Sequence, residues 1–224
     1  MINPESDGLF DNDWDDCGEL SWSEADWQKY LANQETAVRD YIKHYDQLPV
    51  SMDRIDEAAR RMGWELAEPP EALDEEVDLD EVGEIFDGEW DPYTLHRNPV
   101  YISTRALYLS LLAHWERVAT QPDRVSPALG ITLQSLLYRG HEQALQAVQA
   151  LEMGDYTLAV VLFKKALREL NLTLARLNEP DASATPHALR FKEYATPRLF
   201  DLREIWLRVM NECRQNHGGK IQPE

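Results

Sequence analysis

The chain has 224 residues, 43% of them hydrophobic, so it can bury a core in one domain or one and a half. Its 41 Asp/Glu and 22 Lys/Arg residues give a net charge of −19, which argues against duplex nucleic acid as a partner, because phosphate binding depends on cationic side chains. The sequence shows no apolar run near the roughly 18 residues of a membrane span and no signal peptide, so we expect a cytoplasmic protein without a membrane partner. It has only two cysteines, Cys17 and Cys213, so we expect neither a disulfide framework nor a four-ligand zinc site.

The charge is divided unevenly along the chain. Residues 1–92 contain 28 Asp/Glu and 6 Lys/Arg, whereas residues 93–224 contain 13 and 16. One interpretation is an acidic surface that keeps the protein in solution. The other is that the acidic half packs on the weakly basic half or meets a basic partner.

Residues 1–22 form an acidic N-terminal segment that resembles part of an EF-hand calcium loop. In DWDDCGELSWSE, residues 13–24, carboxylates stand at positions one, three and twelve and a glycine at position six, as calcium loops require. The candidate ligands are Asp13, Asp15, Glu19 and Glu24. Against this reading, Cys17 is a soft ligand at position five, and no entering helix is evident. We therefore expect no cofactor, with Ca²⁺ as the alternative, and we expect Glu24 to pair with Ser21 in a capping box.

Residues 23–67 are predicted to form a pair of helices. The first covers about residues 23–47 and ends before Pro49, because its apolar residues recur with helical spacing. These residues are Trp27, Leu31, Val38, Tyr41, Ile42, Tyr45 and Leu48, with polar Gln34 as a gap. The second helix is expected to begin at a Ser51 cap and to carry Met52, Ile55, Ala59 and Met62 on one face.

Arg39 and His44 of the first predicted helix resemble the ribonuclease motif of HEPN-type helical domains, in which an arginine precedes a histidine on one helix. The resemblance implies that His44 acts as acid or base while Arg39 stabilises phosphate charge. The alternative is a solvated helix face with an ordinary histidine, which the acidic surroundings favour because they would repel RNA.

Residues 68–98 are predicted to be an acidic linker or docking segment. Its densest part, residues 71–91, carries a few apolar residues among the carboxylates. Basic and aromatic residues follow it, and we expect a ligand or partner to bind there. The candidate residues are His96, Arg97, Arg105 and Tyr108. The alternative is that Arg105 forms a structural salt bridge with residues 71–91.

Residues 99–217 are predicted to form a bundle of four or more antiparallel helices, followed by a tail over residues 218–224. The expected helices run from about residue 101 to 120, from a Ser126–Pro127 cap to about 151, from after Gly154–Asp155 to Asn178, and from about Pro197 onward. Pro180 to Pro186 is expected to be a loop.

Residues 140–170 resemble one helix pair of a tetratricopeptide repeat, with Gly154–Asp155–Tyr156 at the turn and Ala159, Phe163, Ala166 and Leu167 at the characteristic small and large positions. A shift by the 34-residue period finds no second copy, and a solenoid needs about three repeats. We therefore interpret this stretch as one helical hairpin of the bundle.

Together these patterns predict an all-α protein, an antiparallel helical bundle with an acidic N-terminal helical extension. The function that fits best is a protein-interaction module without catalysis of its own, whose acidic half covers or meets a basic surface. The sequence does not decide between a monomer and a homo-oligomer, and it names no partner. A helical ribonuclease and a calcium-responsive binding protein are the alternatives.

Overall fold

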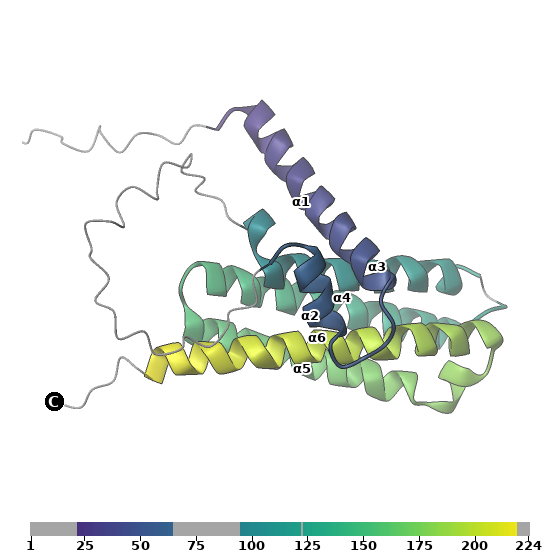
Figure 1. Cartoon of the computed structure of the whole chain (residues 1–224). Helices are drawn as coiled ribbons and strands as arrows, with labels where there is room; N and C mark the ends of the chain where they lie inside the picture. The colour runs from purple at the N-terminus through teal and green to yellow at the C-terminus, as the bar shows by residue number, and fades with distance from the viewer. Residues whose placement is uncertain (1–21, 65–94, 122, 219–224) are drawn as a thin grey trace, which may run out of the picture.

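The computed structural model describes residues 22–64, 95–121 and 123–218, except for the side chains of His96 and of residues 216–218. The described part is helical and contains no strand, which confirms the predicted all-α class (Figure 1). Its elements are α1 (Glu24–Asp46), α2 (Arg54–Arg61), the 3₁₀ helix η2 (Leu95–Arg97), α3 (Pro99–Ala119), α4 (Pro127–Glu152), α5 (Tyr156–Leu177), the 3₁₀ helix η3 (Pro180–Ser183) and α6 (Pro186–Gly218).

Helices α3 to α6 form an antiparallel bundle around one core (Figure 1). The bundle is closed, because α3 and α5 each pack against both α4 and α6. Large apolar side chains from all four helices are fully buried in it. They include Leu107, Trp115, Leu133, Phe163, Phe191 and Trp206. Burial of this apolar surface is the main force that holds the four helices together.

Helices α3, α4 and α5 begin at side-chain caps of the same form. The side chains of Asn98, Ser126 and Asp155 accept hydrogen bonds from backbone N–H groups three residues later, at 2.9, 3.2 and 2.9 Å. Proline follows the cap in the first turn of α3 and of α4. The predicted Ser126–Pro127 start is therefore confirmed, and each cap satisfies a backbone donor that the helix itself leaves free.

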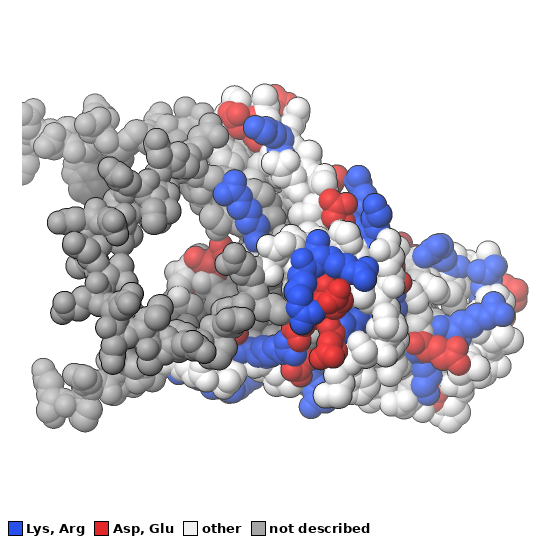
Figure 2. Space-filling model, in the orientation of Figure 1, with Lys and Arg blue, Asp and Glu red and all other residues white. Residues whose placement is uncertain are grey.

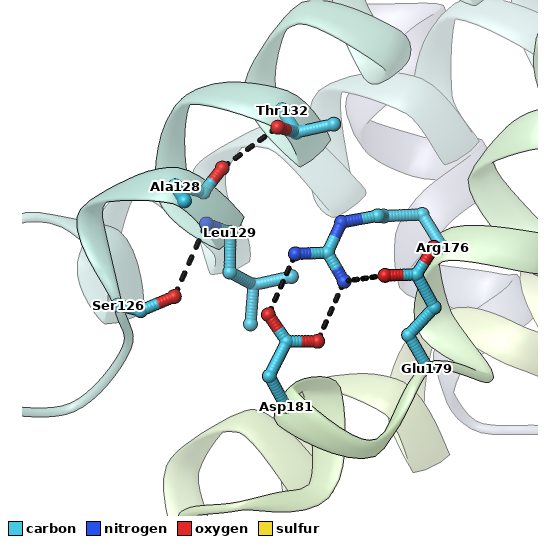
Figure 3. A network of polar contacts seen from close by, with 7 residues as sticks. All are labelled: Ser126, Ala128, Leu129, Thr132, Arg176, Glu179 and Asp181. Atoms are coloured by element: carbon cyan, nitrogen blue, oxygen red, sulfur yellow. Dashed lines mark hydrogen bonds and ion pairs between the residues drawn. The ribbon is translucent and has the colours of Figure 1, made fainter.

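A fork of charged hydrogen bonds fixes the turn after α5, close to the start of α4 (Figure 3). Arg176 donates through both terminal nitrogens to Asp181 at 2.6 and 2.7 Å, and it also donates to Glu179 at 2.9 Å. These bonds hold the pKa of Asp181 below its usual value. The stretch expected to be a plain loop thus contains an ordered 3₁₀ turn, η3, at Pro180–Ser183.

Helix α1 lies across α3 with its C-terminal half, while its N-terminal half projects beyond the bundle (Figure 1). Val38, Tyr41 and Tyr45 belong to the same core as the bundle. The predicted apolar face is wrong in the N-terminal half, where Trp27 and Leu31 are exposed and the buried positions are Tyr30 and Gln34. Gln34 can be buried because it donates to Tyr30 at 3.0 Å and accepts from Tyr101 at 3.3 Å.

The predicted capping residues of α1 and α2 are wrong, although α1 begins within one residue of the predicted position. The capping box of α1 joins Ser23 and Asp26, so Glu24 is the first helical residue and does not cap the helix. Ser23 suits the position because its backbone is extended and its hydroxyl reaches the N–H group three residues on. Helix α2 follows Asp53, which makes no side-chain cap, and its buried residues are Arg54, Ile55 and Ala58. Met52, expected on the buried face, is 93% exposed.

Helix α6 begins at Pro186, eleven residues earlier than predicted. The Thr185 hydroxyl accepts from the N–H of Ala188 at 3.1 Å and caps the helix. Pro197 lies inside the helix, where it cannot donate to the carbonyl of Glu193. The helix continues through the proline because it carries buried residues at helical spacing on both sides. These are Ala188, Phe191, Ala195, Leu199 and Leu202.

Candidate functional site

The predicted partner-binding residues lie in η2 and at the start of α3. Arg97 is exposed, and the side chain of His96 lies outside the described residues. Arg105 is half-buried and donates to the hydroxyl of Tyr101 at 2.7 Å; Tyr101 in turn donates to Gln34 of α1. Arg105 thus belongs to a polar chain that joins α3 to α1. The residues expected to pair with it, 71–91, lie outside the described ranges, so that salt bridge stays a prediction.

Tyr108 lies in the core of the bundle and is 1% exposed. Its ring stacks on Trp206 at 6.0 Å between centroids and contacts the ring of His141 at 5.2 Å. Burial, helped by the charge of Arg105, lowers the pKa of His141 to about 4. The His141 Nε2 atom is buried and has no hydrogen-bond partner among the described residues. Sequence reasoning missed His141, because nothing in its spacing marks it as buried beside Tyr108.

Arg39 and His44 share α1 but point in different directions, about 140° apart around the helix. Arg39 is exposed and His44 is half-buried. No hydrogen bond or ion pair between them occurs in the described structure. The ribonuclease assignment therefore stays a prediction.

Of the candidate calcium ligands, only Glu24 belongs to the described residues; Asp13, Asp15 and Glu19 lie outside them. Glu24 is exposed and accepts a hydrogen bond from Gln28 at 3.3 Å. Within the described ranges, no three His, Cys, Asp or Glu side chains are grouped so that they could hold a metal ion. The calcium hypothesis also stays a prediction.

A surface hollow lies between α6 and the connection from α1 to α2. Its volume is about 630 Å³. The lining residues are Val50, Leu189, Lys192, Glu193, Thr196, Pro197, Phe200 and Asp201, and we call this hollow the α6 groove. Val50, Leu189 and Phe200 are 72%, 41% and 49% exposed, so they present apolar surface to solvent. The groove has room for apolar side chains, and Lys192 and Glu193 can pair with charges that flank those side chains.

A polar network behind the α6 groove joins α1 and α2 to α6. Tyr45 donates a hydrogen bond to Asp201 of the groove, whose carboxyl pKa is raised by burial. Arg54 lies over the Tyr45 ring, 3.7 Å from its centroid, and donates to the Tyr45 carbonyl. Arg198 forms an ion pair with Asp46 of α1. Both arginines are at least nine-tenths buried, so these contacts fix the wall of the groove.

Sequence reasoning missed the α6 groove for a specific reason. Leu189, Lys192 and Glu193 precede Pro197, so a helix predicted to begin at that proline does not include them. The one available signal was the Thr185–Pro186 pair, which has the same form as Ser126–Pro127.

The net negative charge of the chain comes from segments outside the described residues. Residues 1–21 and 65–94 contain 20 of the 41 Asp/Glu and none of the Lys/Arg. The described ranges contain 20 Asp/Glu and 21 Lys/Arg. On the face drawn in Figure 2, basic and acidic side chains are interspersed over the described part. The described ranges taken together are therefore nearly neutral.

Among the described helices, none combines the length and the apolar character needed to cross a lipid bilayer. No protein-family model matches the chain, and comparisons with curated proteins and with solved structures found no significant similarity.

Proposed function

We propose that this protein is a protein-interaction module that acts by binding, with the α6 groove as its docking site for an apolar segment of a partner protein. The observation that carries the proposal is the exposure of Val50, Leu189 and Phe200 around one hollow of about 630 Å³. Clustered apolar side chains around a concave surface are typical of binding sites, whereas isolated ones are ordinary.

The charged rim of the groove supports a protein as the partner. Lys192 and Glu193 stand beside the apolar residues, so the rim offers one charge of each sign. Such a rim orients a polypeptide that carries charges beside its apolar side chains.

The network behind the groove favours tight binding by fixing its wall in advance. Tyr45, Arg54 and Arg198 hold α6 against α1 and α2 through buried contacts. A wall that is already ordered loses little conformational entropy when a partner docks. An amphipathic helix laid along α6 is the binding mode that suits a groove of this shape.

Photo-crosslinking in cells of the source organism tests the proposal. A benzoylphenylalanine replaces Phe200 in the groove, and a second variant carries it at Leu109, an exposed position of α3 that serves as the matched control. We expect a protein that crosslinks from position 200 and not from position 109. Its purified form should bind the wild-type chain and bind the Leu189→Asp variant at least tenfold more weakly.

Identical crosslinks from both positions, or none from position 200, would contradict the proposal. So would unchanged affinity of the Leu189→Asp variant, because a charge in the groove must oppose an apolar ligand. Circular dichroism of each variant confirms that the helices are intact, since Leu189 and Phe200 are partly exposed and their replacement leaves the core unchanged.

A further inference from the structure

The outer face of α5 presents a narrow stripe of apolar and basic side chains. At about 100° per residue, Leu158, Val161, Lys165, Arg168 and Leu172 lie within about 80° of one another around the helix, and they extend along it for about 21 Å. The three apolar residues are 43%, 45% and 42% exposed. The opposite side of α5 packs on α4 and α6 through Ala159, Phe163, Ala166 and Leu170. We call this outer stripe, together with the neighbouring Lys164, the α5 face.

The α5 face carries three positive charges that have no counter-ion within the described part of the chain. Lys164, Lys165 and Arg168 form no ion pair with any of the described residues. The one acidic residue of α5, Glu169, is turned inward and lies 3.2 Å from Arg139 of α4. Lys164 and Arg168 also line a shallow hollow of about 410 Å³ with Leu167, Asn171 and Leu172. This surface matches a segment in which carboxylates alternate with apolar side chains.

The chain itself contains such a segment. Residues 71–91, EALDEEVDLDEVGEIFDGEWD, have eleven Asp/Glu, no Lys/Arg, and large apolar residues throughout, among them Val77, Ile85, Phe86 and Trp90. Its charge is opposite to that of the α5 face, and its apolar residues match the exposed leucines and valine there. The twenty residues 1–20 carry fewer carboxylates over a similar length, so residues 71–91 are the better match.

The first described residues after this segment lie at the end of the bundle where α4 ends and α5 begins. Residue 91 is four residues from Leu95, where η2 begins, a distance of at most about 14 Å along the chain. Asn98, at the start of α3, donates a hydrogen bond to Glu152 at the end of α4. Helix α5 starts four residues after Glu152, at Tyr156. The chain therefore enters the described part at the same end of the bundle as the start of α5, the helix that carries Leu158 and Val161.

From these observations we infer that residues 71–91 dock on the α5 face of their own chain. The carboxylates pair with Lys164, Lys165 and Arg168, and the apolar residues cover Leu158, Val161 and Leu172. The contact concerns a different helix from the α6 groove and does not depend on the proposed function.

Photo-crosslinking in the full-length protein tests this contact. Benzoylphenylalanine at Val161 is irradiated in dilute solution, and the crosslinked peptides are identified by mass spectrometry. We expect crosslinks to peptides from residues 71–91 within the same chain. Because charge pairing contributes to the contact, the yield should fall severalfold between about 0.05 and 1 M salt, as the Debye length shrinks from over 10 Å to about 3 Å.

Two charge-reversal variants with equal net charge separate docking from general attraction. The first reverses the α5 face, K164E/K165E/R168E, and should reduce the crosslink at least fivefold. The second reverses three exposed cations of α1, K29E/R39E/K43E, and should leave it nearly unchanged. A third variant, with Glu75, Glu76 and Asp78 changed to the corresponding amides, should lose the crosslink as the first does and leaves α5 untouched.

Each other result overturns the inference. Crosslinks to a different part of the chain exclude residues 71–91 as the occupant. Crosslinks between chains, seen as a covalent dimer, assign the α5 face to a second copy. An equal loss in both charge-reversal variants, or no loss in the amide variant, shows that specific charge pairing does not hold the segment.

Discussion

Replacing Gly140 with alanine tests how tightly α3 and α4 pack. A Cβ atom at position 140 would lie 2.5 Å from the hydroxyl oxygen of Tyr108 and 3.3 Å from Cζ of the same ring. Tyr108 cannot move aside easily, because it is 1% exposed and stacks on Trp206. The substitution must therefore push the two helices apart or distort the Tyr108 side chain.

The expected size follows from two opposing effects. Overpacking of a well-packed core costs about 1 to 3 kcal/mol. Alanine in place of glycine within a helix contributes about 1 kcal/mol in the other direction. We therefore expect Gly140→Ala to lower the free energy of unfolding by about 1 kcal/mol, which for a chain of this size corresponds to a fall in Tm of about 2 to 4 °C.

The same helix provides a matched control. A Cβ atom at Gly130 of α4 would have nothing within 4 Å, so Gly130→Ala should raise the free energy of unfolding by about 0.5 to 1 kcal/mol. A second control is Tyr108→Phe, which removes the hydroxyl that the new methyl group meets. In that background, Gly140→Ala should become at least about 1 kcal/mol less unfavourable.

Urea denaturation followed by circular dichroism at 222 nm measures all four variants. Refutation would come from a Gly140→Ala protein that is stabilised as much as Gly130→Ala. The reasoning would also be refuted if Gly140→Ala changed the free energy of unfolding equally in the wild-type and Tyr108→Phe backgrounds. The cost of the alanine would then not come from contact with the Tyr108 hydroxyl.

Three further predictions follow from the polar groups. Between about pH 6.5 and 4 the unfolded chain binds a proton at His141 that the folded chain excludes. The free energy of unfolding should therefore fall as the pH drops through this range, by up to about 3 kcal/mol. In urea titrations at several pH values, His141→Phe should remove this pH-dependent loss of stability. Tyr45→Phe removes a hydrogen bond that lowers the pKa of Asp201, so carboxyl NMR should show a further rise of that pKa. The variant should also lose about 1 to 2 kcal/mol of stability. An unchanged titration of Asp201 would contradict the hydrogen bond from Tyr45. Calorimetric titration with calcium should give no binding heat for the wild-type chain, whereas heat that disappears in Glu24→Gln would support the calcium hypothesis.

Local signals predicted the helices well where a cap, a spacing and a stop agreed. Ser126–Pro127 and Gly154–Asp155 mark the limits of α4 and α5 in the sequence as they do in the structure. The same reasoning failed at Pro197, because a helix with a strong buried stripe tolerates an internal proline. The burial of Gln34 was not predictable for a related reason. It depends on hydrogen bonds with Tyr30 of the same helix and with Tyr101 of α3, and the residue spacing within α1 cannot reveal a partner on another helix.

The candidate site was less predictable than the fold, for a similar physical reason. Tyr45 and Asp201 are 156 residues apart, and only the packing of α6 against α1 brings them together. For Arg105 the sequence predicts a bound partner or a salt bridge with residues 71–91, whereas among the described residues its hydrogen bond goes to Tyr101, one turn before it. Residue types identified the polar groups that need partners, but the partners depend on tertiary contacts.

The uneven charge of the chain has a consequence for how its molecules behave toward one another. The described ranges contain 21 Lys/Arg and 20 Asp/Glu, so a particle made of them alone would be close to its isoelectric point at neutral pH. Such a particle would have little electrostatic resistance to association. Residues 1–21 and 65–94 contribute twenty negative charges and no positive ones. The repulsion that keeps neighbouring molecules apart thus resides in the acidic segments, and its range shortens as ionic strength rises.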